Sequence, residues 1–247
     1  MDRTTELLVL LHHGLDQLAP GLPESTLRAW SLCAPLPADP RVLDLGCGTG
    51  AQALVLAGRC GADVTAVDLA PALLATVRAR AEAAGLADRV RTVEADLRAL
   101  PFPDGAFDVI WSEGAIYLAG FDAGLKGWRR LLRPGGFIVV TELSWLVADP
   151  PAEAVDFWAA GYPAMRTVDG NVAAAERLGF RVVDVFTLPD AGWWAYYGPL
   201  RERLAPFLVQ HPDDPDAVAV VEETSREIGC YERHGAAYGY VFYVLQG

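Results

Sequence analysis

Residues 42–50 read VLDLGCGTG, and this stretch decides the fold. An apolar run that includes the acidic residue Asp44 is followed by glycines at alternate positions, Gly46, Gly48 and Gly50. Glycine lets the backbone approach a ligand closely and adopt a positive φ without steric cost. The residues from Ala51 onward are typical of a helix, whose first N–H groups are free to bind a ligand. The stretch predicts a strand, a ligand-binding turn and a helix; an ordinary tight turn is the alternative.

The composition limits the class of protein and of partner. A chain of 247 residues makes one large α/β domain or two small ones, and 52% apolar residues are enough for a substantial core. The formal net charge is -12, with a pI of about 4.7. Nucleic-acid binding depends on Lys and Arg contacts to phosphate, so this charge argues against it. We therefore expect no nucleic-acid partner.

The cysteines and the N-terminus indicate a compartment. Cys33, Cys47, Cys60 and Cys230 form no C-x-x-C pair or Cys/His cluster, so we expect no metal site. Scattered thiols are typical of a cytoplasmic enzyme. The apolar run 7–11 lacks a basic flank and is too short to span a bilayer, so we expect a helix there and no membrane association. Both a monomer and a homodimer remain open.

Apolar strand-like runs alternate with helical patterns along the chain, which favours βαβ units and a parallel sheet. Helices are expected over 3–18 and 24–33, before the first strand. The expected strands are 41–45, 63–67, 90–94, 107–111, 137–142, 181–187 and 237–245. A further helix is expected from Pro71, a favoured residue for a helix start, to Gly85, a common helix end.

The G-x-G-x-G spacing preceded by Asp44 resembles the first motif of class I S-adenosylmethionine-dependent methyltransferases. It differs from the G-x-G-x-x-G fingerprint of dinucleotide-binding proteins. Asp68 closes the second expected strand, where an acidic residue can accept hydrogen bonds from both ribose hydroxyls. The same geometry serves NAD, and a helix cap ahead of Pro71 is the alternative for Asp68.

Further motifs extend the resemblance over residues 40–142. Asp96 follows the third expected strand; in the family an Asp here accepts from the adenine amino group, and the backbone N–H of the next residue, Leu97, meets a ring nitrogen. A plain loop carboxylate is the alternative for Asp96. Residues 107–117 (FDVIWSEGAIY) resemble the family's fourth motif, and residues 130–136 (RLLRPGG) its turn before strand five.

The resemblance implies a fold and a methyl donor. The fold is Rossmann-like α/β: a seven-stranded, mostly parallel sheet with an antiparallel last strand, and helices on both faces. One domain, 1–247, would comprise an N-terminal helical cap (1–38), a cofactor-binding core (39–142), a lid-like insertion (143–171) and a C-terminal half (172–247). The implied residues for S-adenosyl-L-methionine are Asp44, Gly46, Cys47, Gly48, Gly50, Asp68, Leu69, Asp96, Leu97, Ser112 and Glu113.

Three residues are candidates for a direct role in methyl transfer. Glu113 would lie beside the transferred methyl group, where it could accept from the methionine amino group or from the substrate; a solvated loop carboxylate is the alternative. His12 ends the first helix and could act as a base because histidine titrates near neutral pH; a partly exposed helix-end histidine is the alternative. Tyr117 is the third catalytic candidate. The chain has no D/N-P-P-Y motif, which disfavours an amide or nucleic-acid-base acceptor.

Aromatic residues gather after expected strands five and six, at the sheet edge where ligands bind in α/β proteins. Aromatic rings near a sulfonium contribute roughly 0.5–2 kcal/mol by cation–π contact when desolvated. For any single ring, core packing is the alternative. The expected substrate pocket comprises Tyr117, Glu142, Trp145, Trp193, Trp194 and Tyr197.

We therefore expect a methyltransferase that acts on a small molecule, similar to a bacterial group of small methyltransferases. An NAD-dependent oxidoreductase is an alternative, which the glycine spacing opposes. The sequence also lacks a Tyr-x-x-x-Lys pair, since Lys126 is its one lysine. A non-catalytic S-adenosylmethionine-binding module is a further alternative, because intact donor motifs fit it equally well.

Overall fold

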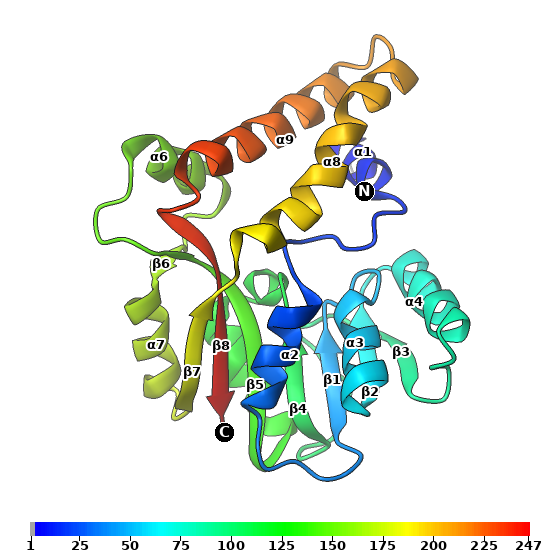
Figure 1. The fold of residues 1–247 in the computed structure, drawn as a ribbon, viewed down its shortest axis with the longest axis vertical. Helices are drawn as coiled ribbons and strands as arrows, with labels where there is room; N and C mark the ends of the chain where they lie inside the picture. Colours follow the sequence, from blue (N-terminus) through cyan, green and yellow to red (C-terminus); the bar gives the residue numbers. More distant parts are fainter. Residues whose placement is uncertain (1–2) are drawn as a thin grey trace.

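The computed structural model describes residues 3–247, which form one mixed sheet with helices on both faces (Figure 1). The strands are β1 (Arg41–Leu45), β2 (Asp63–Asp68), β3 (Val90–Glu94), β4 (Phe107–Ser112), β5 (Leu132–Trp145), β6 (Arg166–Thr167), β7 (Arg181–Thr187) and β8 (Tyr238–Gln246). The α-helices are α1 (Arg3–His12), α2 (Pro23–Ser31), α3 (Ala51–Cys60), α4 (Pro71–Ala83), α5 (Phe121–Trp128), α6 (Ala152–Gly161), α7 (Val168–Arg177), α8 (Asp190–Gln210) and α9 (Pro215–His234). Short 3₁₀ helices, η1 (Ile116–Leu118) and η2 (Arg129–Leu131), flank α5.

The strand order is β3-β2-β1-β4-β5-β8-β7, and β6 pairs with β5 outside this path. Neighbouring strands are parallel except at β8, which runs antiparallel to both β5 and β7. The fold class predicted from the sequence is therefore confirmed. The order reverses between β1 and β4, and ligands in open α/β sheets bind at such a switch point.

Some predicted boundaries need correction. The fifth strand covers residues 132–145 rather than 137–142, because its second half continues along β8 as far as the Trp145–Tyr238 pair. The two-residue strand β6 was not predicted, since so short a segment carries no periodic signal. The first helix ends at His12 rather than at residue 18; Gly14, with a φ of 74°, lies in the chain that turns away.

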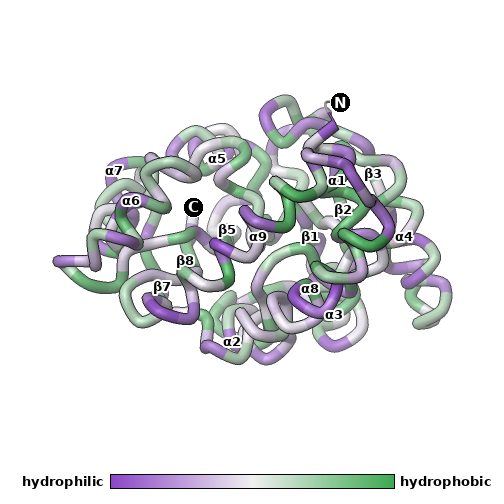
Figure 2. Tube along the Cα trace, turned by 90° about the horizontal axis from the view of Figure 1, so that it is seen from above, coloured by the Kyte–Doolittle hydropathy of each residue, from purple (hydrophilic) through white to green (hydrophobic). Residues whose placement is uncertain are grey.

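The core has a layer on each face of the sheet. Alternate side chains of β1 point to opposite faces, so that Val42 belongs to one layer and Leu43 to the other. Helices α2, α3 and α4 cover the first face, and α5 and α7 cover the second. Viewed from above, α6 and α7 lie at one end of the molecule and α4 and β3 at the other (Figure 2).

Helices α1, α8 and α9 form a further layer above the carboxyl ends of the parallel strands (Figure 1). Apolar side chains of this layer, such as Leu7 and Leu200, continue the first core cluster. The layer therefore closes over the sheet edge at which the sequence motifs end. No helix within residues 3–247 has the length and hydropathy that crossing a bilayer requires.

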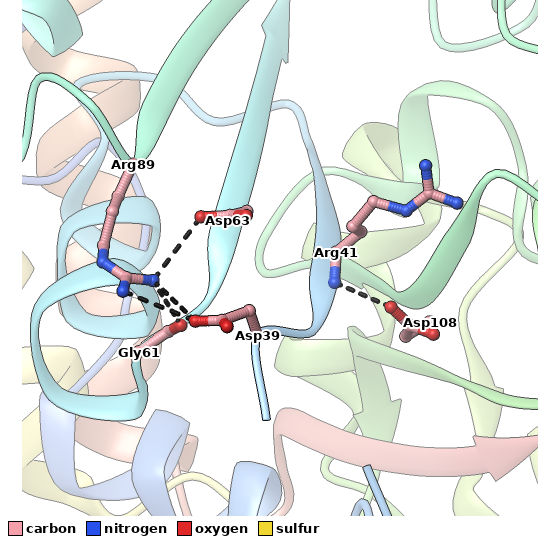
Figure 3. Close-up of polar contacts among 6 residues, drawn as sticks. All are labelled: Asp39, Arg41, Gly61, Asp63, Arg89 and Asp108. Carbon is pink, nitrogen blue, oxygen red and sulfur yellow. Dashed lines mark hydrogen bonds and ion pairs between the residues drawn. The ribbon is translucent and has the colours of Figure 1, made fainter. Parts of the chain in front are cut away.

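At the amino ends of the parallel strands, charged groups connect neighbouring segments by hydrogen bonds and ion pairs (Figure 3). The Arg89 guanidinium donates to the Gly61 carbonyl at 2.7 Å and also contacts the carboxylates of Asp39 and Asp63. The Arg41 N–H donates to Asp108 at 2.8 Å. Arg133, at the start of β5, donates to the other oxygen of Asp108 at 2.7 Å. Asp108 thereby joins the starts of β1, β4 and β5.

We predict that Asp108→Ala lowers the free energy of unfolding by about 1.5–3 kcal/mol, because two hydrogen bonds to a buried carboxylate are lost. Urea unfolding provides the measurement. Asp104→Ala is the matched control: its side chain is 77% exposed and pairs with Arg130 on the surface, so we expect a loss below about 1 kcal/mol. Equal losses in the two variants would show that Asp108 does not fasten this edge.

Candidate active site

The glycine turn after β1 is shaped by close packing. Gly46, Gly48 and Gly50 have φ values of 71°, 52° and 83°, all in the left-handed region. A Cβ on Gly46 would lie 2.3 Å from the Cβ of Ala115, and one on Gly50 would lie 3.0 Å from Val77. The N–H groups of Gly46 and Cys47 both donate to the Val67 carbonyl, at 2.9 and 3.0 Å. The turn is therefore held between β2 and the chain that follows β4.

Asp68 connects this turn to the end of β2. One carboxylate oxygen accepts the Gly48 N–H at 3.0 Å, and the other accepts the Ala70 N–H at 3.0 Å. Ala70 is the N-cap residue of α4, and its own side chain makes no capping hydrogen bond. Asp68 is thus a bridge between two loops at the carboxyl edge rather than a simple helix cap.

A cavity of about 240 Å³ opens at the ends of β1, β2 and β3, and we call it the β2–β3 cavity. Its lining residues are Gly46, Asp68, Leu69, Asp96, Leu97, Arg98 and Leu118. Five of the residues predicted to bind the donor, which are far apart in the sequence, therefore lie together in the structure: Gly46, Asp68, Leu69, Asp96 and Leu97. The Arg98 guanidinium donates to both oxygens of the Asp96 carboxylate at 2.7–3.2 Å, and these hydrogen bonds lower the pKa of Asp96 to about 2.

Two buried carboxyl groups, Asp44 and Glu113, lie near the glycine turn. The Asp44 side chain is 2% exposed, and its Oδ2 has no hydrogen-bond partner among the described residues. Burial raises the pKa of Asp44 to about 8, and the charges of Glu113 and Asp68 add to this effect. Glu113 accepts from Thr26 at 2.7 Å, and burial raises the pKa of Glu113 to about 7.

Glu113 is held by neutral donors. Besides Thr26, the Trp111 indole N–H donates to Glu113 at 2.8 Å and the Gln52 amide at 3.4 Å. Glu113 is 8% exposed, so the alternative of a solvated loop carboxylate is wrong. Within residues 3–247, no arginine, lysine or histidine hydrogen-bonds to Asp44 or Glu113. A pair of buried acids without a basic partner favours a positively charged ligand.

Other predicted residues at this edge have structural contacts. The Ser112 hydroxyl is buried and donates to the Leu45 carbonyl at 2.9 Å, which joins β4 to β1. Cys47 is 4% exposed, and burial raises the pKa of its thiol. Their side chains therefore support the turn, and their direct contact with a donor stays a prediction.

The loop between α1 and α2 lies against the glycine turn. The Thr49 hydroxyl donates to the Asp16 carbonyl at 2.6 Å, and Arg80 donates to the same carbonyl at 2.7 Å. A Cβ on Gly114 would lie 2.5 Å from the Cβ of Ala19. This N-terminal loop therefore covers the space between the glycine turn and the end of β4.

A second cavity, of about 270 Å³, lies under the helical layer and is rich in phenol groups; we call it the tyrosine cavity. It is bordered by the N-terminal loop, the end of β5, α6, α8 and α9. Its lining residues are Leu18, Ala19, Pro20, Gly114, Tyr117, Glu142, Leu143, Trp158, Gly161, Tyr162, Trp193, Tyr196, Glu227 and Tyr240.

The predicted pocket residues divide into two groups. Tyr117, Glu142 and Trp193 line the tyrosine cavity. Trp145, Trp194 and Tyr197 are not among its lining residues, so core packing, the alternative, describes them better. Their contacts are as follows: Trp145 packs edge-on against Tyr238, Trp194 lies under the Arg201 guanidinium at 5.2 Å, and the fully buried Tyr197 donates to Glu227 at 2.7 Å.

Several lining residues escaped the sequence analysis. Trp158 and Tyr162 are spaced i, i+4 at the end of α6, and Trp193 and Tyr196 are spaced i, i+3 on α8. These spacings place the two side chains of each pair on one helix face. They are the sequence signal from which Trp158, Tyr162 and Tyr196 could have been predicted to line a common pocket. Glu227 carries no such signal, because a glutamate on a helix is normally solvated.

Two glutamates face the tyrosine cavity. Glu142, on β5, is 3% exposed and accepts from the Tyr162 hydroxyl; burial raises its pKa to about 7. Glu227, on α9, accepts from Tyr197, and burial raises its pKa as well. Burial also raises the pKa of Tyr240, and the charges of neighbouring Tyr117, Glu142 and Glu227 add to it. These groups therefore share one enclosed space.

His12 does not line the tyrosine cavity but contacts Tyr196, which does. Its Nδ1 lies 2.8 Å from the Leu8 carbonyl, which can only accept, so Nδ1 carries the hydrogen. Nε2 of the neutral ring then accepts from the Tyr196 hydroxyl at 2.8 Å. Burial lowers the pKa of His12 and favours this neutral form. His12 is the last residue of α1 and is partly exposed, so the alternative of a partly exposed helix-end histidine also agrees with the structure.

In the described part of the chain, no group of three or more His, Cys, Asp or Glu side chains has an arrangement that could hold a metal ion.

Residues 42–136 match a protein family described as "Methyltransferase domain". The 27-O-demethylrifamycin SV methyltransferase of Amycolatopsis mediterranei (strain S699) is 34% identical over 217 residues, which cover 81% of this chain and 78% of that protein. Demethylmenaquinone methyltransferase of Thermus thermophilus is 49% identical over 107 residues, 42% of this chain and 48% of that protein. The match thus spans about half the length of this relative.

The fold is also similar to that of a solved structure. An S-adenosylmethionine-dependent methyltransferase from Geobacter sulfurreducens, crystallised with S-adenosyl-L-homocysteine, superposes with a TM-score of 0.84 and 26% identity. The superposition covers 97% of each chain. From the identity shared with the rifamycin methyltransferase over most of both chains, and from this agreement in fold, we conclude that the chain belongs to the superfamily of class I S-adenosylmethionine-dependent methyltransferases.

Proposed function

We propose that this protein transfers a methyl group from S-adenosyl-L-methionine to a small-molecule acceptor. The observation that carries the proposal is the pair of buried acids, Asp44 and Glu113, at the glycine turn beside the β2–β3 cavity. The donor brings a sulfonium and an ammonium group, and when bound it supplies an electrophilic methyl group. The unpartnered Oδ2 of Asp44 fits a ligand with such charges.

The β2–β3 cavity suits the adenosine portion of the donor. Asp68 already accepts two backbone N–H groups, but a carboxylate offers about four lone-pair sites, so ribose hydroxyls can bind in addition. Asp96 and Leu97 line the same cavity, and the resemblance implies that they contact the adenine ring. Arg98 would hold the Asp96 carboxylate in place without filling all its acceptor sites.

The tyrosine cavity suits the acceptor. Gly114 and the N-terminal loop line it, and the same loop contacts the glycine turn, so the two ligands would meet there. The protein's contribution is to position both ligands and to exclude water. Tyr117 would contact the acceptor, Glu113 would bind the donor's ammonium group, and His12 would act through Tyr196. Helix α6 supplies Trp158, which supports the lid role proposed for residues 143–171.

The proposal extends to partners and location. The net charge of -12 supports a small-molecule acceptor over a nucleic acid. We place the protein in the cytoplasm because its cysteines are free thiols in the structure, as is typical of reducing compartments. Family membership and the glycine spacing favour methyl transfer over the NAD-dependent alternative.

Calorimetry with S-adenosyl-L-homocysteine tests donor binding directly. We expect saturable binding of one ligand per chain, and no binding at millimolar ligand would contradict the proposal. Turnover separates the enzyme from a non-catalytic binding module. Formation of S-adenosyl-L-homocysteine with any member of a panel of small acceptors supports catalysis, whereas tight donor binding without turnover across the panel favours the binding module.

We predict that Asp68→Ala weakens binding of S-adenosyl-L-homocysteine by about 1–3 kcal/mol, because charge-assisted hydrogen bonds to the ribose are lost. The bond from Gly48 to Asp68 is lost too, which loosens the glycine turn. Asp63→Ala is the matched control, since Asp63 lies at the other end of the same strand with its side chain 46% exposed. Equal affinities of the two variants would show that Asp68 does not contact the donor.

The affinity for S-adenosyl-L-methionine is predicted to rise between about pH 6 and 9. A cationic ligand favours the ionised carboxylates, whereas burial raises the pKa of Glu113 to about 7 and that of Asp44 to about 8. Below these values binding must expel protons, so affinity falls as the pH falls; above them it levels off.

Calorimetry across this pH range, in buffers of different ionisation enthalpy, measures both the affinity and the proton release. Asp44→Asn should remove the upper part of the pH dependence, while Asp63→Asn should retain it. An affinity that does not change with pH would show that the buried acids do not receive the donor's charge.

A further inference from the structure

The charged residues that line the tyrosine cavity are all acidic. Glu142 enters it from β5 and Glu227 from α9, so acidic groups reach it from two separate elements. Among its lining residues, all of them in the described part of the chain, there is no lysine, arginine or histidine. The cavity therefore offers negative charge without a positive partner in its wall.

The contacts of the two glutamates are neutral. Tyr162 donates to Glu142, and Tyr197 donates to Glu227 at 2.7 Å. Arg166 is close enough to Glu142 for its charge to act on that carboxyl, but its guanidinium is paired with Asp122 at 2.7 Å. Most of the charge on each carboxylate is therefore left for a ligand to neutralise.

The rest of the wall is aromatic. Tyr117 and Tyr162 meet edge to face with ring centroids 6.1 Å apart, and Trp193 stacks on Tyr240 at 5.3 Å. Trp158 also lines the space, and its indole N–H has no hydrogen-bond partner among the described residues. Aromatic faces combined with carboxylates are the groups that recognise organic ammonium ions. A carboxylate or phosphate ligand would meet like charge in the cavity, with only neutral hydroxyl and indole N–H groups to donate hydrogen bonds to it.

We propose that the acceptor is a small organic amine, bound as its ammonium ion between Glu142 and Glu227 and surrounded by the rings of the tyrosine cavity. This assignment of the substrate class rests on the proposed function. It uses both acidic residues of the cavity together with its aromatic wall, whereas a neutral hydroxyl acceptor would need one carboxylate at most, as a base. The cavity volume of about 270 Å³ suits an amine of modest size.

The same arrangement provides for the proton. An ammonium ion has no lone pair, so it must lose a proton before its nitrogen can attack. A carboxylate of the cavity, Glu142 or Glu227, would accept that proton. The nitrogen lone pair would then form the bond to the methyl carbon while the carbon–sulfur bond breaks, and the bonding pair would stay on sulfur. The products are a methylated ammonium ion, a neutral thioether and the protonated carboxyl group, so charge and atoms balance.

Calorimetry on the full chain saturated with S-adenosyl-L-homocysteine tests the assignment with three probes of similar shape: benzylamine, benzyl alcohol and benzoate. We expect benzylamine to bind roughly tenfold more tightly than benzyl alcohol, and benzoate to bind more weakly than either. Glu142→Gln and Glu227→Gln should each reduce the preference for benzylamine at least several-fold. Glu222→Gln is the matched control, because Glu222 is exposed on the same helix as Glu227 and should leave the preference unchanged.

The outcomes separate the two proposals. Failure of S-adenosyl-L-homocysteine to bind the wild-type chain would overturn the proposed function. Normal binding of that ligand, with benzylamine no tighter than benzyl alcohol, would overturn the amine assignment and leave the proposed function standing. The wild-type comparison of the three probes decides the question even if a glutamine variant does not fold. A preference that survives in both glutamine variants would also overturn the role of the two glutamates.

Discussion

The close approach of β1 to the chain that follows β4 is the constraint on which the rest of the site depends. Gly46 lies so near Ala115 that a Cβ would come within 2.3 Å of the neighbouring one, and its φ of 71° also excludes most side chains. This approach brings Asp44 and Glu113 to the same edge of the sheet and leaves room for the β2–β3 cavity. A bulkier turn would separate the acids from the cavity beside them.

The molecule keeps its acids buried in two places, and the physical logic is the same in both. Burial makes the charged form of a carboxyl unfavourable, so the pKa values of Asp44, Glu113 and Glu142 are raised toward neutrality. Neutral groups donate hydrogen bonds to Glu113 and Glu142, while no basic side chain of the described residues hydrogen-bonds to Asp44 or Glu113. Such groups lower the stability of the free protein, and the positively charged ligands that we propose for the two sites would offset this loss.

The sequence predicted the strands of the core and the acidic residues at their ends well. The reason is local: a parallel strand has a short apolar run, and its carboxyl end shares one edge with its neighbours. It was less successful where long-range pairing decides. The second half of β5 exists because β8 pairs with it, and α1 ends early, before a glycine that starts the covering loop. Trp145 and Tyr197 were expected in the pocket but serve as packing residues beside it.

By itself, the sequence determined which residues form the proposed donor end of the site, because the order Asp44, Gly46 to Gly50, Asp68 and Asp96 follows successive strand ends and needs no knowledge of the distant chain. Only the tertiary structure decided which residues form the proposed acceptor end. Glu227 comes from the long helix α9, whose rotation about its axis is set by packing against α8 and α1. Which face of such a helix lines a cavity depends on contacts between elements far apart in sequence, and no local pattern records that choice.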